Sequence, residues 1–229
     1  EERAGADSEA FDIAEVKEVL LPAELESVAA GVELLNARLE ELGLTPLKVR
    51  TTGKPAKVML GMAPAPELEE RVSGLPAPSK EGYRLTVDSK GIVILGHDPA
   101  GLYYGLVTLA RLIDKEGRVP ALGISDWPDQ EIRGTYVSGK ADWERRIPEF
   151  ASLKLNLVLF EDTSLYELDD SVVREEWQRI FALCREHFIE PVPELQSLGW
   201  GQHVLTHRPA AAEGVSVSRV PFEVSENEI

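Results

Sequence analysis

The chain has 229 residues, of which 43% are hydrophobic and 28% charged, proportions typical of a soluble globular protein with one large or two modest domains. Its 40 acidic and 24 basic residues give a net charge of −16, which disfavours binding to nucleic acid or to an anionic membrane surface. One cysteine excludes an internal disulfide, and no segment approaches the ~20 apolar residues of a membrane helix. The chain starts at Glu1 without methionine, so we expect any signal peptide to have been removed or never included.

The first 80 residues predict short strands around one amphipathic helix. Residues 11–21 are rich in apolar and β-branched side chains and predict a strand. A helix follows from Pro22 to Gly43, because apolar residues recur at helical spacing and glycine favours the helix end. Residues 47–50 and 57–60 predict two more strands, and the proline-rich stretch 64–78 predicts a loop with one possible helical turn.

Residues 82–113, GYRLTVDSKGIVILGHDPAGLYYGLVTLARLI, form the most informative run. Alternating apolar residues, a turn ending at Gly91 and a second apolar run predict a β-hairpin. Asp98 and Pro99 then suit the N-cap and first turn of a helix, which we expect Gly117 to close. Gly101 and Gly105 lie four residues apart, where the helix can approach a sheet closely.

The second half alternates between strand and helix patterns. Residues 119–130 contain two prolines and predict a linker, and residues 210–229 predict a loop or frayed tail. Between them we expect strands at 132–139, 155–161 and 189–198, separated by helices at 143–153 and 171–188. Such alternation indicates βαβ units with parallel strands, and the apolar run at 155–160 predicts a strand buried on both faces.

The run at 82–113 resembles the small non-catalytic domain that precedes the barrel of family 20 glycoside hydrolases, the β-N-acetylhexosaminidases. The resemblance lies in the Tyr-Arg-Leu-x-Val strand and in Pro-Ala-Gly-x-Tyr-Tyr-Gly-Leu-x-Thr-Leu at the helix start. It implies an α/β fold: an accessory α+β domain at 1–118, a linker at 119–130, and the start of a (β/α)₈ barrel at 131–229. The last segment has room for roughly three of the eight units.

In such a barrel the binding site lies at the carboxyl ends of the strands. Residues 125–128 (SDWP) and 132–134 (IRG) resemble the entry to the family's first barrel strand, whose arginine binds sugar hydroxyls. Arg133 is the matching residue, and its guanidinium fork can hold two neighbouring hydroxyl oxygens. The alternative is an arginine paired with a carboxylate at the lower rim of the barrel.

The second and third strands depart from the family pattern. Glu161 and Asp162 stand where the family has histidine and an aspartate pair, and only one of them can face a pocket, because neighbours on a strand point to opposite faces. The other reading is that one of them caps the following turn. Residues 189–200 resemble most closely the hexosaminidase D branch, with Trp200 in place of histidine. Trp200 offers a flat face for a pyranose ring, or packs in the core.

Two further features predict little chemistry. His203 and His207 would share a helix face and raise a metal site, but no third ligand is evident, so we expect no metal and no cofactor. Cys184 lies on the buried stripe of its predicted helix and is expected to be inert.

The resemblance implies a β-N-acetylhexosaminidase that removes terminal N-acetylhexosamine from glycans, with the substrate's own acetamido group assisting. The Asp-Glu pair that performs this chemistry ends the family's fourth strand, which is missing here, so no catalytic residue is assigned and we expect this chain alone to be inactive. The alternative is a non-catalytic carbohydrate-binding or scaffolding module. The expected partners are an N-acetylhexosamine-containing glycan and either the missing barrel portion or a second copy.

Overall fold

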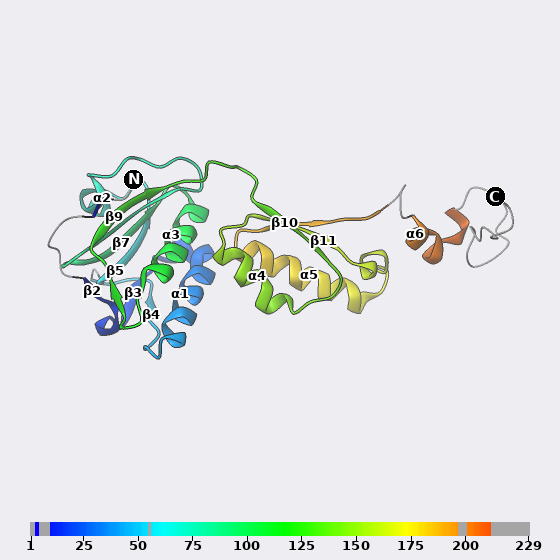
Figure 1. Ribbon diagram of the computed structural model, residues 1–229, viewed down its shortest axis with the longest axis horizontal. Helices are drawn as coiled ribbons and strands as arrows, with labels where there is room; N and C mark the ends of the chain where they lie inside the picture. Colours follow the sequence, from blue (N-terminus) through cyan, green and yellow to red (C-terminus); the bar gives the residue numbers. More distant parts are fainter. Residues whose placement is uncertain (1–2, 5–9, 55, 197–200, 212–229) are drawn as a thin grey trace.

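The computed structural model describes residues 3–4, 10–54, 56–196 and 201–211. Its elements form an elongated molecule with two units in succession (Figure 1). The first unit, residues 3–126, contains a seven-stranded sheet, and the second unit, residues 133–196, contains a three-stranded sheet. One continuous hydrophobic core runs through both units.

The seven-stranded sheet of the first unit mixes parallel and antiparallel strands. The hairpin strands β6 and β7 lie near its middle, and β5 pairs with β7 in parallel. In spatial order the strands are β1 Arg3–Ala4, β9 Leu122–Asp126, β6 Tyr83–Asp88, β7 Gly91–Gly96, β5 Val58–Met62, β3 Glu18–Leu20 and β4 Lys48–Arg50. A separate pair joins β2 Phe11–Asp12 to β8 Arg118–Val119.

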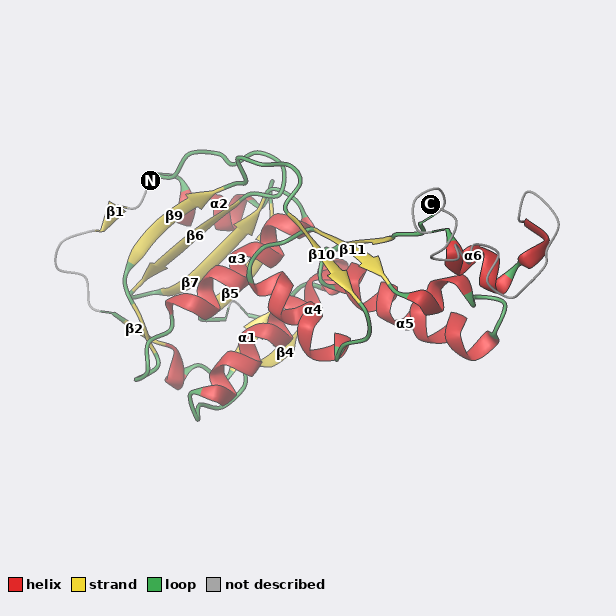
Figure 2. Cartoon of the chain, turned by 45° about the vertical axis from the view of Figure 1, so that its right-hand side comes forward, coloured by secondary structure: helices red, strands yellow, loops and turns green. Residues whose placement is uncertain are grey.

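Helices cover both faces of this sheet (Figure 2). Helices α1 Ala29–Glu41 and α3 Pro99–Leu112 pack together on one face, and α2 Pro66–Val72 packs on the other. The alternation of side chains along β7 explains the division: Ile92 and Ile94 join the large core, whereas Val93 and Leu95 join a small cluster with α2. The first unit is therefore a complete three-layer structure.

The predicted hairpin and helix at 82–113 are confirmed. The Asp98 Oδ1 atom accepts a 2.8 Å hydrogen bond from the Gly101 amide at the start of α3, and its Oδ2 atom accepts one of 2.8 Å from the Glu81 amide. A Cβ atom on Gly101 would lie only 2.0 Å from the Gly82 carbonyl oxygen, so the close approach of helix to sheet requires glycine there. The helix, however, ends at Leu112 and not at Gly117, which has φ +80° in the turn before β8.

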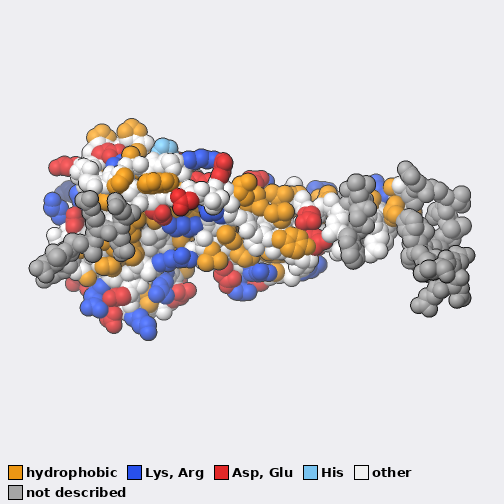
Figure 3. All heavy atoms as spheres, turned by 45° about the horizontal axis from the view of Figure 1, so that its top comes forward, with side chains coloured by type: hydrophobic (Ala, Val, Ile, Leu, Met, Phe, Trp, Pro, Cys, Tyr) orange, Lys and Arg blue, Asp and Glu red, His pale blue; other side chains and the backbone are white. Residues whose placement is uncertain are grey.

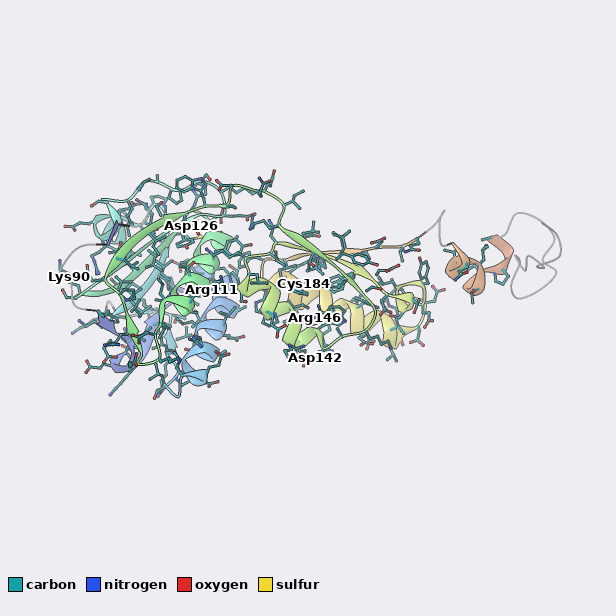
Figure 4. All side chains as sticks on the ribbon, in the orientation of Figure 1. Lys90, Arg111, Asp126, Asp142, Arg146 and Cys184 are labelled. Carbon is teal, nitrogen blue, oxygen red and sulfur yellow. The ribbon has the colours of Figure 1, made fainter. Side chains whose placement is uncertain are left out.

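The second unit has the predicted parallel order β10 Gly134–Ser138, β11 Leu157–Glu161 and β12 Glu190–Pro193. Helices α4 Trp143–Ser152 and α5 Ser171–Glu186 lie on one face of these strands (Figure 1). Phe160 is the centre of the packing, with the rings of Trp143, Trp177 and Phe181 within 5.7 Å of its own. Cys184 on α5 is buried as predicted, and burial raises the pKa of its thiol to about 12 (Figure 4).

Three expectations need correction. Residues 11–21 form two short strands in different sheets, with the 3₁₀ turn Ile13–Glu15 between them. Residues 122–126, inside the predicted linker, form β9, which pairs with β6. The apolar strand β11 is buried on one face only, because Val158 and Phe160 meet the helices while Leu157 and Leu159 stay half-exposed.

The remaining described elements are short. The 3₁₀ helices Ala23–Val28, Thr163–Tyr166 and Pro209–Ala211 and the helix α6 Gln202–His207 complete the chain. Most of the predicted tail at 210–229 lies outside the described residues. None of the helices in the described part is both long and apolar enough to span a membrane.

Candidate functional site

A cavity of about 240 Å³ lies at the carboxyl ends of the three parallel strands, where the topology brings their following loops together. Six of its seven lining residues have polar side chains. It is lined by Ser138, Gly139, Glu161, Asp162, Thr163, Tyr166 and Gln196.

Glu161 supplies the carboxylate of this cavity. The strand register places it opposite Ser138, and it is the last residue of β11. Its Oε2 atom accepts a hydrogen bond from the Tyr136 hydroxyl, and its Oε1 atom accepts one from the Gln196 side-chain amide. The bond to Glu161 raises the pKa of Tyr136, because the carboxylate is an acceptor for the phenol proton. Two donors thus fix both carboxylate oxygens at the cavity wall.

Asp162 has a different role from its neighbour. It is 8% exposed and caps the 3₁₀ turn Thr163–Tyr166. Its Oδ1 atom accepts hydrogen bonds from the amide and the hydroxyl of Ser164, at 2.9 and 2.6 Å. The Trp177 indole donates to the same hydroxyl at 3.0 Å, which ties the turn to the core of α5. Of the two acidic residues, Glu161 carries the polar contacts of the cavity and Asp162 shapes the loop around it.

Tyr166 and Gln196 fix the far wall. The Tyr166 hydroxyl donates to the Gln196 carbonyl oxygen at 3.1 Å and accepts from the Gln196 amide at 2.7 Å. These bonds hold the backbone of Gln196 in place, so its side chain is directed to Glu161. The chain segment after β12 is thereby attached to the loop after β11.

Arg133 lies at the opposite end of the strands from Glu161. It directly precedes β10, and its guanidinium meets the Glu81 carboxylate of the first unit at 2.6 Å. The same side chain donates to the carbonyl oxygens of Gln130 and Lys154 and to the Tyr104 hydroxyl. This is the carboxylate pairing that the alternative interpretation of Arg133 predicts. The structure does not bring Arg133 together with Glu161 and Asp162.

The side chains of three other residues named in the sequence analysis lie outside the described part of the structure. Trp200 lies outside the described residues. His203 and His207 belong to α6, but their side chains are likewise outside the description. Within the described ranges, no group of three or more histidine, cysteine or acidic side chains is placed to hold a metal ion.

Sequence reasoning missed Tyr136 and Tyr166. The alternation of side chains along a strand could have indicated Tyr136. Tyr136 and Ser138 lie on the same face of β10, and in the observed register this face also carries Leu159 and Glu161 of β11. Tyr166 follows a turn, where no periodicity indicates the direction of a side chain. Its contact with Gln196 spans 30 positions and depends on the tertiary fold.

Residues 2–127 match the sequence profile of the glycosyl hydrolase family 20, domain 2. The chain belongs to this family. The match covers the whole first unit and confirms the resemblance seen in the run at 82–113.

Curated relatives agree with this placement. The chain is 24% identical over 193 residues to a lacto-N-biosidase of Bifidobacterium bifidum, covering 76% of this chain and 16% of the relative. It is 29% identical over 136 residues to a beta-hexosaminidase of Vibrio vulnificus, covering 56% of this chain and 14% of the relative. It is 35% identical over 89 residues to beta-hexosaminidase B of Pseudoalteromonas piscicida, covering 34% and 12%. The aligned segments thus cover at most about one sixth of the length of each of these relatives.

Solved structures of family 20 enzymes share the fold. An exo beta-N-acetylglucosaminidase of Vibrio harveyi, crystallised with N-acetylglucosamine, superposes with a TM-score of 0.69 at 19% identity, covering 92% of this chain and 37% of the other. A chitobiase of Flavobacterium johnsoniae gives a TM-score of 0.68 at 20% identity, covering 89% and 35%. The chain therefore has a mixed α/β fold that resembles part of these longer enzymes.

Proposed function

We propose that this chain is the N-terminal part of a β-N-acetylhexosaminidase-like glycoside hydrolase. The observation that carries the proposal is the order of the chain: a family 20 domain 2 is followed directly by three parallel strands with a polar cavity at their carboxyl ends. In the proposed division, residues 1–118 form the accessory domain, 119–130 the linker and 131–229 the opening units of a (β/α)₈ barrel, with the correction that β9 extends the accessory domain to Asp126. The full-length protein would remove terminal N-acetylhexosamine by substrate-assisted, retaining hydrolysis.

Within this proposal, Glu161 binds a sugar hydroxyl directly. Its oxygens are oriented by Tyr136 and Gln196, and a carboxylate accepts the hydrogen bond of a hydroxyl strongly. Asp162 contributes by shaping the loop, and Trp200 is proposed as a stacking surface for the ring. Arg133 would reach a sugar only after leaving Glu81, so its proposed role as a ligand has the least support.

The chain alone is proposed to be inactive. In the family, hydrolysis needs an Asp-Glu pair on a fourth barrel strand, where one carboxylate polarises the acetamido group and the other protonates the leaving oxygen. The three strands of the second unit carry no such pair in the cavity, because Asp162 is committed to capping a turn. The assignment of residues 189–200 to the hexosaminidase D branch belongs to the same proposal.

A chromogenic N-acetyl-β-glucosaminide tests this proposal. The full-length gene product is expected to release the chromophore, and the 229-residue chain is expected to release none above the uncatalysed background. Hydrolysis by the short chain that disappears in Glu161→Gln would contradict the claim of inactivity. A full-length protein that neither hydrolyses nor binds the sugar would contradict the family function itself.

A non-catalytic carbohydrate-binding or scaffolding module is the second candidate. It is favoured by the departures from the family pattern at Glu161 and Trp200. The same assay separates the two candidates, since a module would bind N-acetylglucosamine in a calorimeter without hydrolysing the chromogenic substrate.

The proposed protein partner follows from the uncovered face of β10, β11 and β12. Tyr136 is 52% exposed on this face, Leu157 and Leu159 of β11 are half-exposed, and Figure 3 shows hydrophobic side chains gathered over the middle of the molecule. Exposed apolar patches beside unpaired strand edges favour association. We propose that the missing barrel portion covers this face, and that the chain alone self-associates. Sedimentation is expected to show oligomers that Leu159→Glu reduces; Val172→Glu, on the exposed side of α5, is the matched control.

A further inference from the structure

Each of the three parallel strands is preceded by a residue that bonds to the first unit. Arg133 directly precedes β10, Lys154 lies shortly before β11, and His187 lies shortly before β12. Their partners come from β6, α3 and the carboxyl end of β9, and from Glu81 shortly before β6. The amino-terminal ends of the strands thus meet one surface of the first unit.

The first contact joins Arg133 to Glu81 and Tyr104. The Nη2 atom of Arg133 lies 2.6 Å from the Glu81 carboxylate and 3.2 Å from the Tyr104 hydroxyl. The guanidinium also stacks over the Tyr104 ring, 5.4 Å from its centroid. Both charged side chains are less than one fifth exposed, so removing either one would leave a largely buried charge without its partner, which costs more than breaking a surface ion pair.

The second contact joins Lys154 to Asp126 and Tyr83. The Nζ atom of Lys154 lies 2.8 Å from the Asp126 carboxylate, at the end of β9, and 3.2 Å from the Tyr83 hydroxyl. The Tyr83 hydroxyl in turn donates to Asp126 and shares a 2.6 Å hydrogen bond with Thr108. The carbonyl oxygen of Lys154 accepts from Arg133, so the first two contacts are connected.

The third contact joins His187 to Tyr103. The Tyr103 hydroxyl and the His187 Nδ1 atom lie 2.7 Å apart and are both buried. The Tyr103 ring also packs on Phe188, with 5.3 Å between centroids. A different tyrosine of the first unit therefore contacts the residues before each strand: Tyr104 at β10, Tyr83 at β11 and Tyr103 at β12.

Backbone strain gathers at the same junction. Among the described residues, the non-glycine residues with a left-handed backbone are Glu81, Lys154 and Phe188, at φ values of +60°, +58° and +58°. This conformation is unfavourable for residues other than glycine and persists only where surrounding contacts impose it. All three belong to the contacts just described. At Lys154 and Phe188 it also closes the preceding helices α4 and α5, because the amides of the next residues bond back to the carbonyl oxygens of Phe150 and Cys184.

We infer that the first unit is a base that sets the spacing and register of the three parallel strands, with Tyr83, Tyr103 and Tyr104 as positioning residues. The three hydroxyls fix the strand entries, and the strands place Glu161 and Gln196 at their other ends. This role concerns the geometry of the chain and does not depend on the proposed activity.

Hydrogen exchange followed by mass spectrometry tests the inference, one strand entry at a time. Tyr104→Phe is expected to speed amide exchange at the start of β10, Lys154→Met at the start of β11, and Tyr103→Phe at the start of β12, each by at least about fivefold. Exchange in β5 and β7 is expected to stay unchanged. Tyr136→Phe is the matched control, because it removes the same hydroxyl group at the opposite end of β10.

The pattern of the exchange rates decides the outcome. Increases confined to the strand entry that each variant changes support a positioning role. Slow exchange at the start of β11 in Lys154→Arg, which keeps the positive charge that Lys154→Met removes, supports it further. Uniform acceleration over the whole second unit would reduce the role to general stability and overturn the inference. Unchanged rates in all three variants would overturn it as well, and the conservative changes leave the cores intact for this comparison.

Discussion

Strands β7 and β11 lie inside their respective sheets, yet their side chains meet different surroundings. Every residue of β7 is buried, because α3 packs on one face and α2 on the other. Along β11 buried and half-exposed residues alternate, because α4 and α5 cover one face alone. A sheet covered on both faces therefore adjoins one that the helices of the described residues cover on a single face.

The two units are therefore stabilised in different ways. The first unit buries both faces of its sheet within residues 3–126. The second unit combines a one-sided core with the polar contacts of its three strand entries. Variants that act on one layer at a time test this difference through the free energy of unfolding.

A large effect is expected from Gly101→Ala. The new Cβ atom would lie 2.0 Å from the Gly82 carbonyl oxygen, and the separation of α3 from the sheet that this forces outweighs the roughly 1 kcal/mol gained from alanine in a helix. We expect a loss of about 3 kcal/mol or more in the free energy of unfolding, measured by guanidinium denaturation. Gly74→Ala, where no atom lies within 4 Å, is expected to change it by less than about 0.5 kcal/mol. Equal effects of the two variants would contradict the close packing of α3.

The two faces of β11 can be compared with neighbouring alanine substitutions. Phe160→Ala opens a cavity among three aromatic rings and is expected to cost about 3–5 kcal/mol. Leu159→Ala, on the uncovered face, is expected to cost less than about 1 kcal/mol in the isolated chain. Thermal unfolding of the two variants measures the contrast, and similar losses would show that the second face is already covered.

The junction is expected to weaken in acid through His187. Burial lowers the pKa of its imidazole in the folded chain, whereas the unfolded chain titrates near the ordinary value of about 6.5. As the pH falls through this value the unfolded state binds the proton more readily than the folded state, so stability decreases. Between pH 7.5 and 5.5 we expect the native chain to lose about 1 kcal/mol more than His187→Asn. Identical pH profiles for the two proteins would contradict a neutral, buried His187.

The smallest effect is expected on the outer surface of the first unit. Arg38 pairs with Glu41 within α1, and both side chains are at least one third exposed. Arg38→Gln should lower the free energy of unfolding by less than about 0.5 kcal/mol, with the difference vanishing in high salt. A larger change would mean that Arg38 has a role beyond this ion pair.

Local patterns predicted most elements of the chain. The run at 82–113 carries its own turn, N-cap and close-approach glycines, so neighbouring residues suffice to determine it. Alternating strand and helix patterns gave the parallel order of β10, β11 and β12 for the same reason. Strand β9 was missed, because its flanking prolines suggest a linker and its strand conformation depends on pairing with β6.

The candidate site was less accessible to sequence reasoning. Glu161 and Asp162 could be named as alternatives, but their division into a cavity residue and a capping residue required the structure. Arg133 shows the limit most clearly, since its partner Glu81 is 52 positions away and no local pattern links them. The apolar sequence of β11 led to an overestimate of its burial, because composition does not indicate whether one face or both faces of a strand are covered.

The two oxygens of Asp98 restrict which residues evolution can accept at this position. One oxygen receives the amide of Gly101 and the other the amide of Glu81, whose left-handed backbone begins the contact with Arg133. Serine or asparagine, both common at helix starts, offers a single side-chain oxygen and would serve only one of the two amides well. Aspartate is thus favoured here because a second amide, that of Glu81 outside the helix, also needs an acceptor. Substitutions tolerated at ordinary caps would leave one of the two amides without its partner.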